Sequence, residues 1–314
     1  MQLPYYSGEE IAKVLSYRGL IEHLREGHRQ PPPAVERVLM LQKTASGLEN
    51  SFLIWPAWQH DHSLGIKITT IFPGNSGTVI PGVQAIYVLL DGRTGSPQAL
   101  LDGTEMTYWK TAADSALSAD YLARRDAKTF LMVGAGGLAP YLIRAYQTIR
   151  PGLERILIWN RTAEKARKLA ADWTGSPGLE PVADLENAIR EADIVCCATT
   201  TFAPLIRGAW LIPGTHLDLI GGFTPEMREA DDEAVRRARV FVDSRWFTIE
   251  YVGDLAQPIA NSVISTKDVE GDLFDLCKGA HPGRSSAKEI TLFKSGGGAH
   301  LDLMTAQHVV SLSG

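Results

Sequence analysis

The second part of the chain alternates short apolar runs with segments of helical periodicity. Thr129–Val133 is an apolar run, and after it Leu142, Ile143, Tyr146 and Ile149 recur at the spacing of one helical face. Apolar runs separated by helices predict parallel strands that are buried on both faces. We therefore expect an α/β fold with a doubly wound parallel sheet of the nucleotide-binding type. Its further strands are predicted at 155–159, around 182, and at 193–198, 215–220 and 239–243.

The chain before residue 110 follows a different pattern. Strands are predicted at Arg37–Leu41, Leu64–Ile71 and Val83–Leu90, because Pro- and Gly-rich turns join these runs. One helix is predicted at 7–24, and another at 104–124 leads into the parallel sheet. These elements favour a second domain of antiparallel or mixed α+β type.

Composition and charge exclude two classes of partner. The chain has 314 residues, which by length corresponds to about two domains, and it is large enough to fold without disulfides or a structural metal. Lys and Arg number 31 against 36 Asp and Glu, so the net charge of −5 provides no basic surface for nucleic acid or an anionic membrane. We expect neither as a partner.

The cysteines and the apolar stretches favour a cytoplasmic protein. Cys196 and Cys197 are neighbours, so on a strand they point to opposite faces; together with Cys277 they are expected to be reduced. Two glutamates precede the first basic residue, which is unlike a secretory signal. The uncharged stretch 68–90 is interrupted by Pro and Gly, and it predicts strand–turn–strand rather than a membrane span.

A glycine-rich turn follows the first predicted strand of the parallel sheet. Gly134-Ala-Gly-Gly-Leu-Ala139 matches G-x-G-x-x-A between a strand and a helix, the context in which this motif binds a dinucleotide. Gly134 would form the tight turn, Gly136 would let the backbone approach a pyrophosphate, and Ala139 would allow close helix packing. A glycine turn without a ligand is the alternative. The motif predicts cofactor contacts from Gly134, Ala135, Gly136, Gly137, Leu138 and Ala139.

The end of the second strand indicates which nicotinamide cofactor is preferred. An acidic residue there would bind the ribose 2′-hydroxyl and repel a 2′-phosphate, but the sequence has Trp159-Asn-Arg-Thr162. The guanidinium of Arg161, with donors on Asn160 and Thr162, suits a phosphate dianion. We expect NADPH to be preferred and NADH to be the second cofactor. The alternative is that Arg161 is a solvated residue at a helix start.

Three cations before the parallel sheet become informative only together. Lys67 lies in an alternating strand on the face opposite Ile66 and Ile68, and taken alone it is expected to face solvent. Arg37 and Lys110 taken alone have the same interpretation. A carboxylate substrate, however, needs two or three convergent donors, which these side chains would supply.

Eight short stretches are informative when they are taken together, in their order along the chain. They are Pro33-Ala-Val-Glu-Arg37, Leu64-Gly-Ile-Lys67, Phe72-Pro-Gly-Asn75, Ala99-Leu-Leu-Asp-Gly103, Lys110-Thr-Ala-Ala113, the Gly134 motif, Trp159-Asn-Arg-Thr162 and Phe293-Lys-Ser-Gly-Gly-Gly-Ala299. In this order they resemble the ornithine cyclodeaminase/mu-crystallin family from about Tyr5 to the C-terminus. The resemblance implies a homodimer that acts on amino acids, or on the imines and keto acids derived from them.

The resemblance also implies a division of the chain into two domains. A Rossmann domain that binds NAD(P) is expected at 116–289. A substrate-binding and dimerisation domain is expected from both chain ends, 1–115 with 290–314. In this arrangement Ile290–Lys294 and a helix at 301–310 return to the first domain.

Site residues are carried over from the family position by position. Arg37 matches its first carboxylate-binding arginine, and Lys67 matches its active-site lysine. Lys110 stands in place of its second carboxylate-binding arginine, so the charge is kept but the bidentate fork is lost. Thr111 and Asp302 also match motif positions. On the nicotinamide side of the cofactor, the carried-over residues are Ala198, Thr199, Thr200 and Gly221.

One departure separates the chain from the cyclodeaminases of the family. Those enzymes place an acidic residue after the Gly-Gly that follows the fifth strand, whereas here Phe223 stands there and cannot move a proton. The segment Gly221-Gly-Phe-Thr-Pro-Glu-Met-Arg-Glu229 is similar to the branch that reduces cyclic ketimines. That branch converts Δ1-pyrroline-2-carboxylate to L-proline and Δ1-piperideine-2-carboxylate to L-pipecolate, in proline metabolism or hydroxyproline degradation.

These residues predict a reductase mechanism. Arg37 and Lys110 would hold the substrate carboxylate, and hydride would pass to the carbon of the protonated imine. Lys67 would position the carboxylate or relay the proton, and the sequence leaves both roles open. The alternatives are an amino-acid dehydrogenase, an ornithine cyclodeaminase, and a non-catalytic binding protein like mu-crystallin. No metal is expected, because His60 and His62 have no further histidine nearby in sequence.

Overall fold

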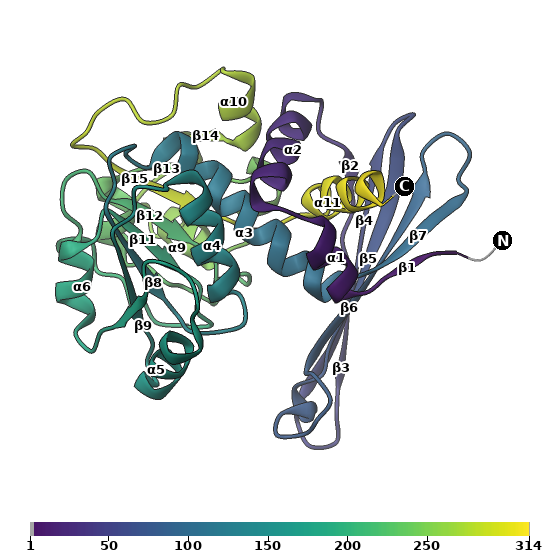
Figure 1. Ribbon diagram of the computed structural model, residues 1–314, viewed down its shortest axis with the longest axis horizontal. Helices are drawn as coiled ribbons and strands as arrows, with labels where there is room; N and C mark the ends of the chain where they lie inside the picture. Colours follow the sequence, from purple (N-terminus) through teal and green to yellow (C-terminus); the bar gives the residue numbers. More distant parts are fainter. Residues whose placement is uncertain (1–2, 314) are drawn as a thin grey trace. The chain divides into compact units, whose positions relative to one another are not determined.

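Two sheets organise the chain, and each belongs to one of two compact units. The structure, a computed structural model, describes residues 3–313 (Figure 1). One unit consists of the chain up to Lys110 together with the segment from Gly298 onward, and the other is Thr111–Gly297. The chain passes between the units within α3 (Gly103–Leu122) and again in the glycine run before α11 (Ala299–Leu312).

The strands of Thr111–Gly297 are β8 (Thr129–Val133), β9 (Arg155–Trp159), β10 (Leu179–Pro181), β11 (Ile194–Cys197), β12 (His216–Leu219), β13 (Ala238–Val242), β14 (Val269–Asp272) and β15 (Ile290–Lys294). They form one sheet in the order β10-β9-β8-β11-β12-β15-β13-β14, and each pairing is parallel. The chain order reverses between β8 and β11, which is where doubly wound sheets bind their ligands. The predicted Rossmann-type α/β fold is confirmed.

Helices cover both faces of this sheet because its strands are apolar on both sides. Leu131 and Val133 pack in one core with Ile189 of α6. Phe130 points to the other face, where its ring lies 4.8 Å from that of Tyr146 on α4. The helices of this unit are α4 (Ala139–Ile149), α5 (Ala163–Asp172), α6 (Leu185–Glu191), α7 (Asp232–Arg237), α8 (Arg245–Thr248), α9 (Gly253–Ala260) and α10 (Leu273–Lys278), with short 3₁₀ turns η2 (Gly208–Trp210) and η3 (Thr266–Asp268).

The prediction that Ile290–Lys294 returns to the first domain is wrong. As β15 it pairs with β12 on one side and β13 on the other, and it is buried along its whole length. A strand in the middle of a parallel sheet needs apolar residues on both faces, which Ile290, Leu292 and Phe293 supply. The return begins after the glycines, with the predicted C-terminal helix α11.

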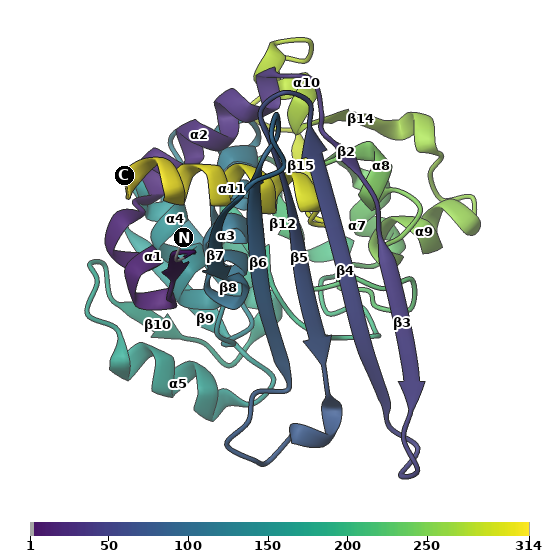
Figure 2. The same ribbon diagram turned by 90° about the vertical axis from the view of Figure 1, so that its right-hand side faces the viewer.

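The other unit is built on a mostly antiparallel sheet. Its order is β1-β7-β6-β5-β4-β2, and β3 also pairs with β4. Among the described strands of this sheet, only β1 and β7 pair in parallel. Helix α11 packs against β4, β5 and β6 on one face (Figure 2). The strands are β1 (Tyr5–Tyr6), β2 (Ala34–Val35), β3 (Val38–Lys43), β4 (Glu49–Gln59), β5 (Ser63–Ile71), β6 (Val83–Asp91) and β7 (Pro97–Asp102).

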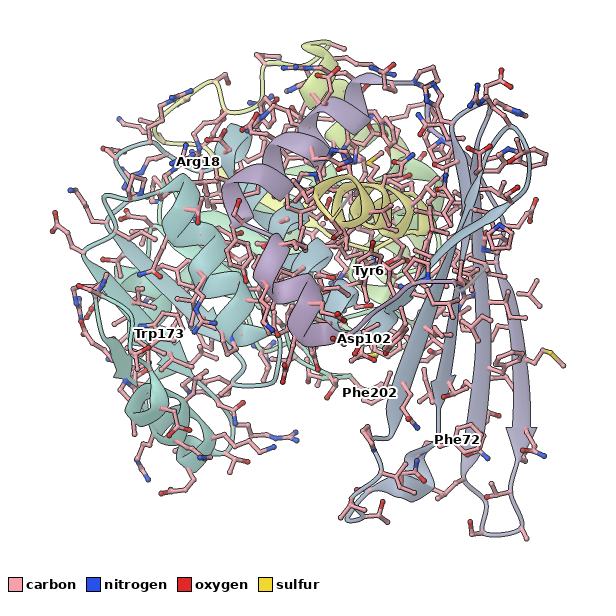
Figure 3. All side chains as sticks on the ribbon, turned by 45° about the vertical axis from the view of Figure 1, so that its right-hand side comes forward. Tyr6, Arg18, Phe72, Asp102, Trp173 and Phe202 are labelled. Atoms are coloured by element: carbon pink, nitrogen blue, oxygen red, sulfur yellow. The ribbon has the colours of Figure 1, made fainter. Side chains whose placement is uncertain are left out.

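The helices of this unit begin where side chains cap them. The single helix predicted at 7–24 is two helices, α1 (Gly8–Val14) and α2 (Tyr17–Arg29), because Ser16 Oγ accepts from the Gly19 amide at 3.2 Å and starts a new helix. Asp102 caps α3 by accepting from the amides of Thr104 and Glu105 (Figure 3). A 3₁₀ turn, η1 (Pro73–Asn75), follows β5. Within residues 3–313, no helix has both the length and the apolar character needed to cross a bilayer.

Candidate functional site

A row of side chains crosses the antiparallel sheet at Lys67. Lys67 of β5 pairs with Trp55 of β4 and with Tyr87 of β6, so the three side chains lie on the same face. Lys67 is only 6% exposed and Tyr87 is fully buried. The interpretation of Lys67 as an outward-facing strand lysine is therefore wrong.

Lys67 and Lys110 share one carboxylate. Asp302, on α11, places Oδ2 2.7 Å from Lys67 Nζ and Oδ1 2.9 Å from Lys110 Nζ. Lys110 also donates to the carbonyl of Gly298 at 3.2 Å. The two ammonium groups lie 5.4 and 5.9 Å from the ring centroid of Trp55, within the range of a cation–π interaction. The structure thus brings three predicted positions together from β5, α3 and α11.

This cluster carries an excess of buried positive charge. Burial, with a smaller contribution from nearby Lys110, lowers the pKa of Lys67 to about 8, although Asp302 opposes both effects. Burial would raise the pKa of Asp302, but the two lysines together hold it below its usual value. With two ammonium groups against one carboxylate, the cluster gains from a second anion. A carboxylate is one anion that two ammonium groups bind well.

Two buried donors flank the lysine pair. Trp55 Nε1 and Tyr87 Oη meet no hydrogen-bond partner among the described side chains and backbone. Burial and the charge of Asp302 raise the pKa of Tyr87 well above its ordinary value, so it stays a hydroxyl donor. Tyr87 could not be selected from the sequence, since its pairing with Lys67 across the sheet is visible only in the strand register.

Arg37 lies apart from the two lysines. The strands before and after Arg37, β2 and β3, both pair with β4. Continuing their registers places Arg37 opposite Trp55, the residue of β4 that pairs with Lys67. Its side chain is exposed, and no ion pair joins it to another residue between 3 and 313. Thr111 follows Lys110 in α3 and is half-buried. For both residues, substrate binding stays a prediction.

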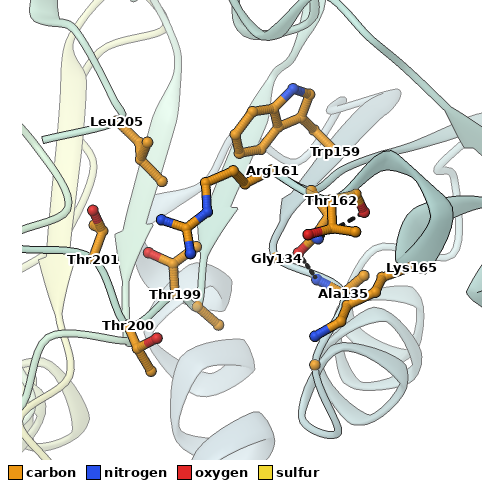
Figure 4. A pocket seen from close by; sticks show the side chains of 13 residues that line it. Gly134, Ala135, Trp159, Arg161, Thr162, Lys165, Thr199, Thr200, Thr201 and Leu205 are labelled. Carbon is orange, nitrogen blue, oxygen red and sulfur yellow. Dashed lines mark hydrogen bonds between the residues drawn. The ribbon is translucent and has the colours of Figure 1, made fainter. Parts of the chain in front are cut away.

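Most of the predicted cofactor residues line a cavity of about 260 Å³ at the carboxyl ends of β8, β9 and β11 (Figure 4). Gly134 has a φ of 111°, and a Cβ there would lie 2.6 Å from the carbonyl of Ala198, so only glycine fits. Gly136 is exposed and a Cβ on it would meet nothing, which leaves its backbone open to a ligand. The lining residues are Gly134, Ala135, Gly136, Trp159, Asn160, Arg161, Thr162, Lys165, Ala198, Thr199, Thr200, Thr201 and Leu205.

The side-chain amide of Asn160 is hydrogen-bonded within the protein. Its Oδ1 accepts from the Ala135 amide at 3.1 Å, and its Nδ2 donates to the carbonyl of Thr162 at 2.9 Å. Asn160 thereby ties the glycine turn to the end of β9. Gly137 and Leu138 continue the turn outside the lining set, and Ala139 is buried at the start of α4.

Two cations border the cavity. Arg161 extends across it toward Thr199, and Lys165 lies on α5 beside the glycine turn (Figure 4). Thr162 stands at the N-cap position of α5, as predicted, but its side chain makes no capping hydrogen bond. Sequence reasoning missed Lys165, although its position three residues after the cap predicts that it lies near Thr162 on the first turn of the helix.

The ends of β11 and β12 are held together by an acidic residue that sequence reasoning also missed. The fully buried carboxylate of Glu229 accepts hydrogen bonds from Thr199 and from the Gly221 amide. Phe223, two residues after Gly221, is 57% exposed. The position after Gly221 and Gly222 therefore carries an exposed aromatic side chain in place of an acidic one.

Comparisons with known proteins decide the family. The model of the ornithine cyclodeaminase/mu-crystallin family matches residues 7–311. The chain belongs to this family. It is 43% identical over 296 residues to the Delta(1)-pyrroline-2-carboxylate reductase of Paracoccus denitrificans, covering 94% of this chain and 92% of that protein. The resemblance stated from the sequence is confirmed.

Solved structures of the family share the whole fold. The Delta(1)-pyrroline-2-carboxylate reductase of Thermococcus litoralis, in complex with NADH and L-proline, is similar with a TM-score of 0.91 at 28% identity, covering 99% of this chain and 97% of that one. The iminosuccinate reductase of Paracoccus denitrificans, in complex with NAD⁺, has a TM-score of 0.90 at 26% identity, covering 100% and 97%.

Proposed function

We propose that this family member is an oxidoreductase that reduces cyclic ketimine carboxylates with a nicotinamide cofactor. Its substrate would be Δ1-pyrroline-2-carboxylate, reduced to L-proline, with Δ1-piperideine-2-carboxylate as the six-membered homologue. The buried pair of Lys67 and Lys110 on Asp302 carries the proposal, because its excess charge requires an anionic ligand. Relatives named for this reaction, at 43% and 28% identity, support it.

The lysine pair binds the substrate through its carboxylate. Lys110 supplies a point charge where the family has a guanidinium, and Arg37 adds a further cation from the same cross-strand row. The donors Trp55 Nε1 and Tyr87 Oη lie beside Lys67 and limit the orientations in which the substrate ring can bind. A carboxylate held at several points fixes the imine carbon for attack.

Lys67 manages the proton of the reaction. Hydride adds to the carbon of the protonated imine, the C=N π electrons move to nitrogen, and the iminium charge disappears as the secondary amine forms. With a pKa of about 8, Lys67 is mostly protonated at neutral pH and donates a proton, directly or through water, to the nitrogen of the neutral imine before the hydride adds. The bound cofactor supplies the hydride.

The residues around the cavity fit NADPH better than NADH. Residues 160–162, directly after β9, include no acidic side chain to repel a ribose 2′-phosphate. Arg161, Lys165 and the hydroxyl of Thr162, which makes no capping hydrogen bond, would bind that phosphate. The similar solved structures contain NADH and NAD⁺, which supports a nicotinamide cofactor for this chain. The preference for the 2′-phosphorylated form is supported by the cations of this chain.

The outer face of the antiparallel sheet supports a homodimer. On the face of the sheet opposite to the Lys67 side chain, residues of β4, β5 and β6 form three apolar cross-strand rows. Trp58, within one of these rows, and Val38, which pairs with Ile54 beside another, are each 48% exposed. An apolar face of this extent favours burial against a second copy. The rows are Ile54–Ile68–Ile86, Pro56–Ile66–Val88 and Trp58–Leu64–Leu90.

An oxidation assay tests the function. NADPH consumption is followed with Δ1-pyrroline-2-carboxylate, with the six-membered imine, and with pyruvate plus ammonia. Turnover of the cyclic imines supports the proposal, whereas turnover of pyruvate with ammonia alone identifies an amino-acid dehydrogenase. We place the protein in the cytoplasm, since Cys196 and Cys197 are buried as thiols.

A further inference from the structure

Glu229 bridges two backbone segments at the carboxyl edge of the parallel sheet. Its Oε1 accepts from Thr199 N at 2.7 Å and from Thr199 Oγ1 at 2.8 Å, and its Oε2 accepts from Gly221 N at 2.7 Å. Thr199 follows β11 and Gly221 follows β12, which are adjacent strands. One carboxylate therefore satisfies three donors and links two strand ends.

Two more buried charges fix Glu229 in turn. Asp254, on α9, accepts from the Glu229 amide at 2.7 Å, and its other oxygen lies 3.1 Å from Lys294 Nζ. Asp254, Lys294 and Glu229 are all 0% exposed. Such a set is stable only while each charge keeps its partner. The backbone of Glu229 is thus held by Asp254, while its carboxylate holds Thr199 and Gly221.

The two bridged segments touch each other directly. A Cβ at Gly221 would collide with the backbone of Thr199, and a Cβ at Gly134 would lie 3.4 Å from the Thr199 methyl. A displacement of Thr199 therefore moves the wall of the cavity. Thr199 and Thr200 line one side of this cavity, opposite Lys165 and the glycine turn (Figure 4).

We propose that Glu229 is a positioning residue that shapes the nicotinamide half of the cofactor site by fixing Thr199 and Gly221. The inference rests on the proposed function, because it needs a dinucleotide in this cavity. In doubly wound sheets the adenosine lies toward the second strand and the second mononucleotide lies beyond the switch point. Arg161 and Lys165 are on the adenosine side, so Glu229 acts on the other half alone.

Two ligands distinguish the two halves of the cofactor site in a binding experiment. NADP⁺ occupies both halves, whereas 2′,5′-ADP carries only the adenosine with its 2′-phosphate. In Glu229→Gln the amide keeps one acceptor, and its NH₂ group faces an N–H donor, so one of the two segments is released. Glu226→Gln, an exposed change in the same segment, is the matched control.

Calorimetry on the full-length protein gives the test. We expect Glu229→Gln to bind NADP⁺ about tenfold more weakly, the loss of one hydrogen bond to a charged group, and to bind 2′,5′-ADP as wild type does. Glu226→Gln should match wild type for both ligands. Unchanged NADP⁺ affinity, or equal weakening of both ligands, overturns the inference. Absence of NADP⁺ and NADPH binding by wild type overturns the proposed function instead.

A measurement on wild type covers the case in which the variant does not fold. Burial raises the pKa of Glu229 to about 7, with Lys294 lowering it and Asp254 raising it; the Cys197 thiol also faces it from β11. Protonation removes an acceptor, so the ratio of NADP⁺ to 2′,5′-ADP affinity should fall as the pH drops below about 7. The 2′-phosphate titrates in both ligands and cancels. Because the 5′-phosphate of 2′,5′-ADP is a monoester that titrates in the same range, the ratio is also taken against 2′-AMP, and the fall should appear with both references. A constant ratio overturns the inference.

Discussion

Lys67 and Lys110 come from a strand and a helix, yet they meet at the two oxygens of one carboxylate, 2.7 and 2.9 Å from Asp302. The cluster is closed to solvent and carries more positive than negative charge. Its chemistry is that of a carboxylate receptor.

Replacing Lys67 by Met should abolish most turnover. The methionine fills the same space but provides neither charge nor proton, and we expect kcat to fall by about a hundredfold or more. NADPH binding, measured by fluorescence, should be unchanged because the cavity at Gly134 does not include this residue. Near-normal kcat in Lys67→Met would remove Lys67 from the mechanism.

The affinity for a carboxylate ligand should depend on the protonation of Lys67. Its pKa is lowered to about 8, so the ammonium is present below that pH and is lost above it. We expect the affinity for pyrrole-2-carboxylate, a planar ring acid without a titration in this range, to fall as the pH rises above about 8. Lys67→Met should bind weakly with no such dependence. A flat profile for wild type from about pH 7 to about 10 would contradict the assignment.

Asp302→Asn should destabilise the unit that contains it. The change leaves two buried ammonium groups without their counter-ion, a loss of about 3 kcal/mol in the free energy of unfolding. Urea unfolding measures it, with the exposed Asp61→Asn as control. If both variants unfold alike, the lysines do not depend on Asp302.

The location of the lysine pair shows where sequence reasoning ends. The turn at Gly134 was predictable because strand, glycines and helix are contiguous. Whether Lys67 faces water or α11 depends on a helix from the other end of the chain, which strand periodicity cannot detect. Glu229 was missed for the same reason, since its partners follow two different strands. The strand β4 was missed because Pro56 interrupts it, and β15 was assigned to the wrong unit because a short apolar run does not specify its neighbours.

Cofactor preference should depend on the two cations of the cavity. Arg161→Ala removes a charge that suits a 2′-phosphate, so we expect KM for NADPH to rise by about tenfold while KM for NADH stays the same. Lys165→Ala should act in the same direction. Lys168→Ala, on the exposed part of α5 outside the cavity, is the control. A ratio of the two KM values that is unchanged by Arg161→Ala would refute its role.

The apolar outer face of the antiparallel sheet predicts the oligomeric state. Light scattering should give twice the mass of one 34.3 kDa chain. Ile66→Lys places a charge in the centre of the apolar rows and should shift the protein to monomer, because an unpaired buried charge opposes association. Gln98→Lys, on the exposed part of β7, should remain dimeric. A wild-type monomer would contradict the proposed dimer.

The central claim is that hydride passes to the imine carbon next to a clamped carboxylate. Incubation of Δ1-pyrroline-2-carboxylate with NADPH carrying deuterium at the transferred C4 position tests it, with mass spectrometry and NMR of the product. The account predicts L-proline with one deuterium on the α carbon. Proline without that label, or no proline while NADPH remains bound and unoxidised, would contradict it.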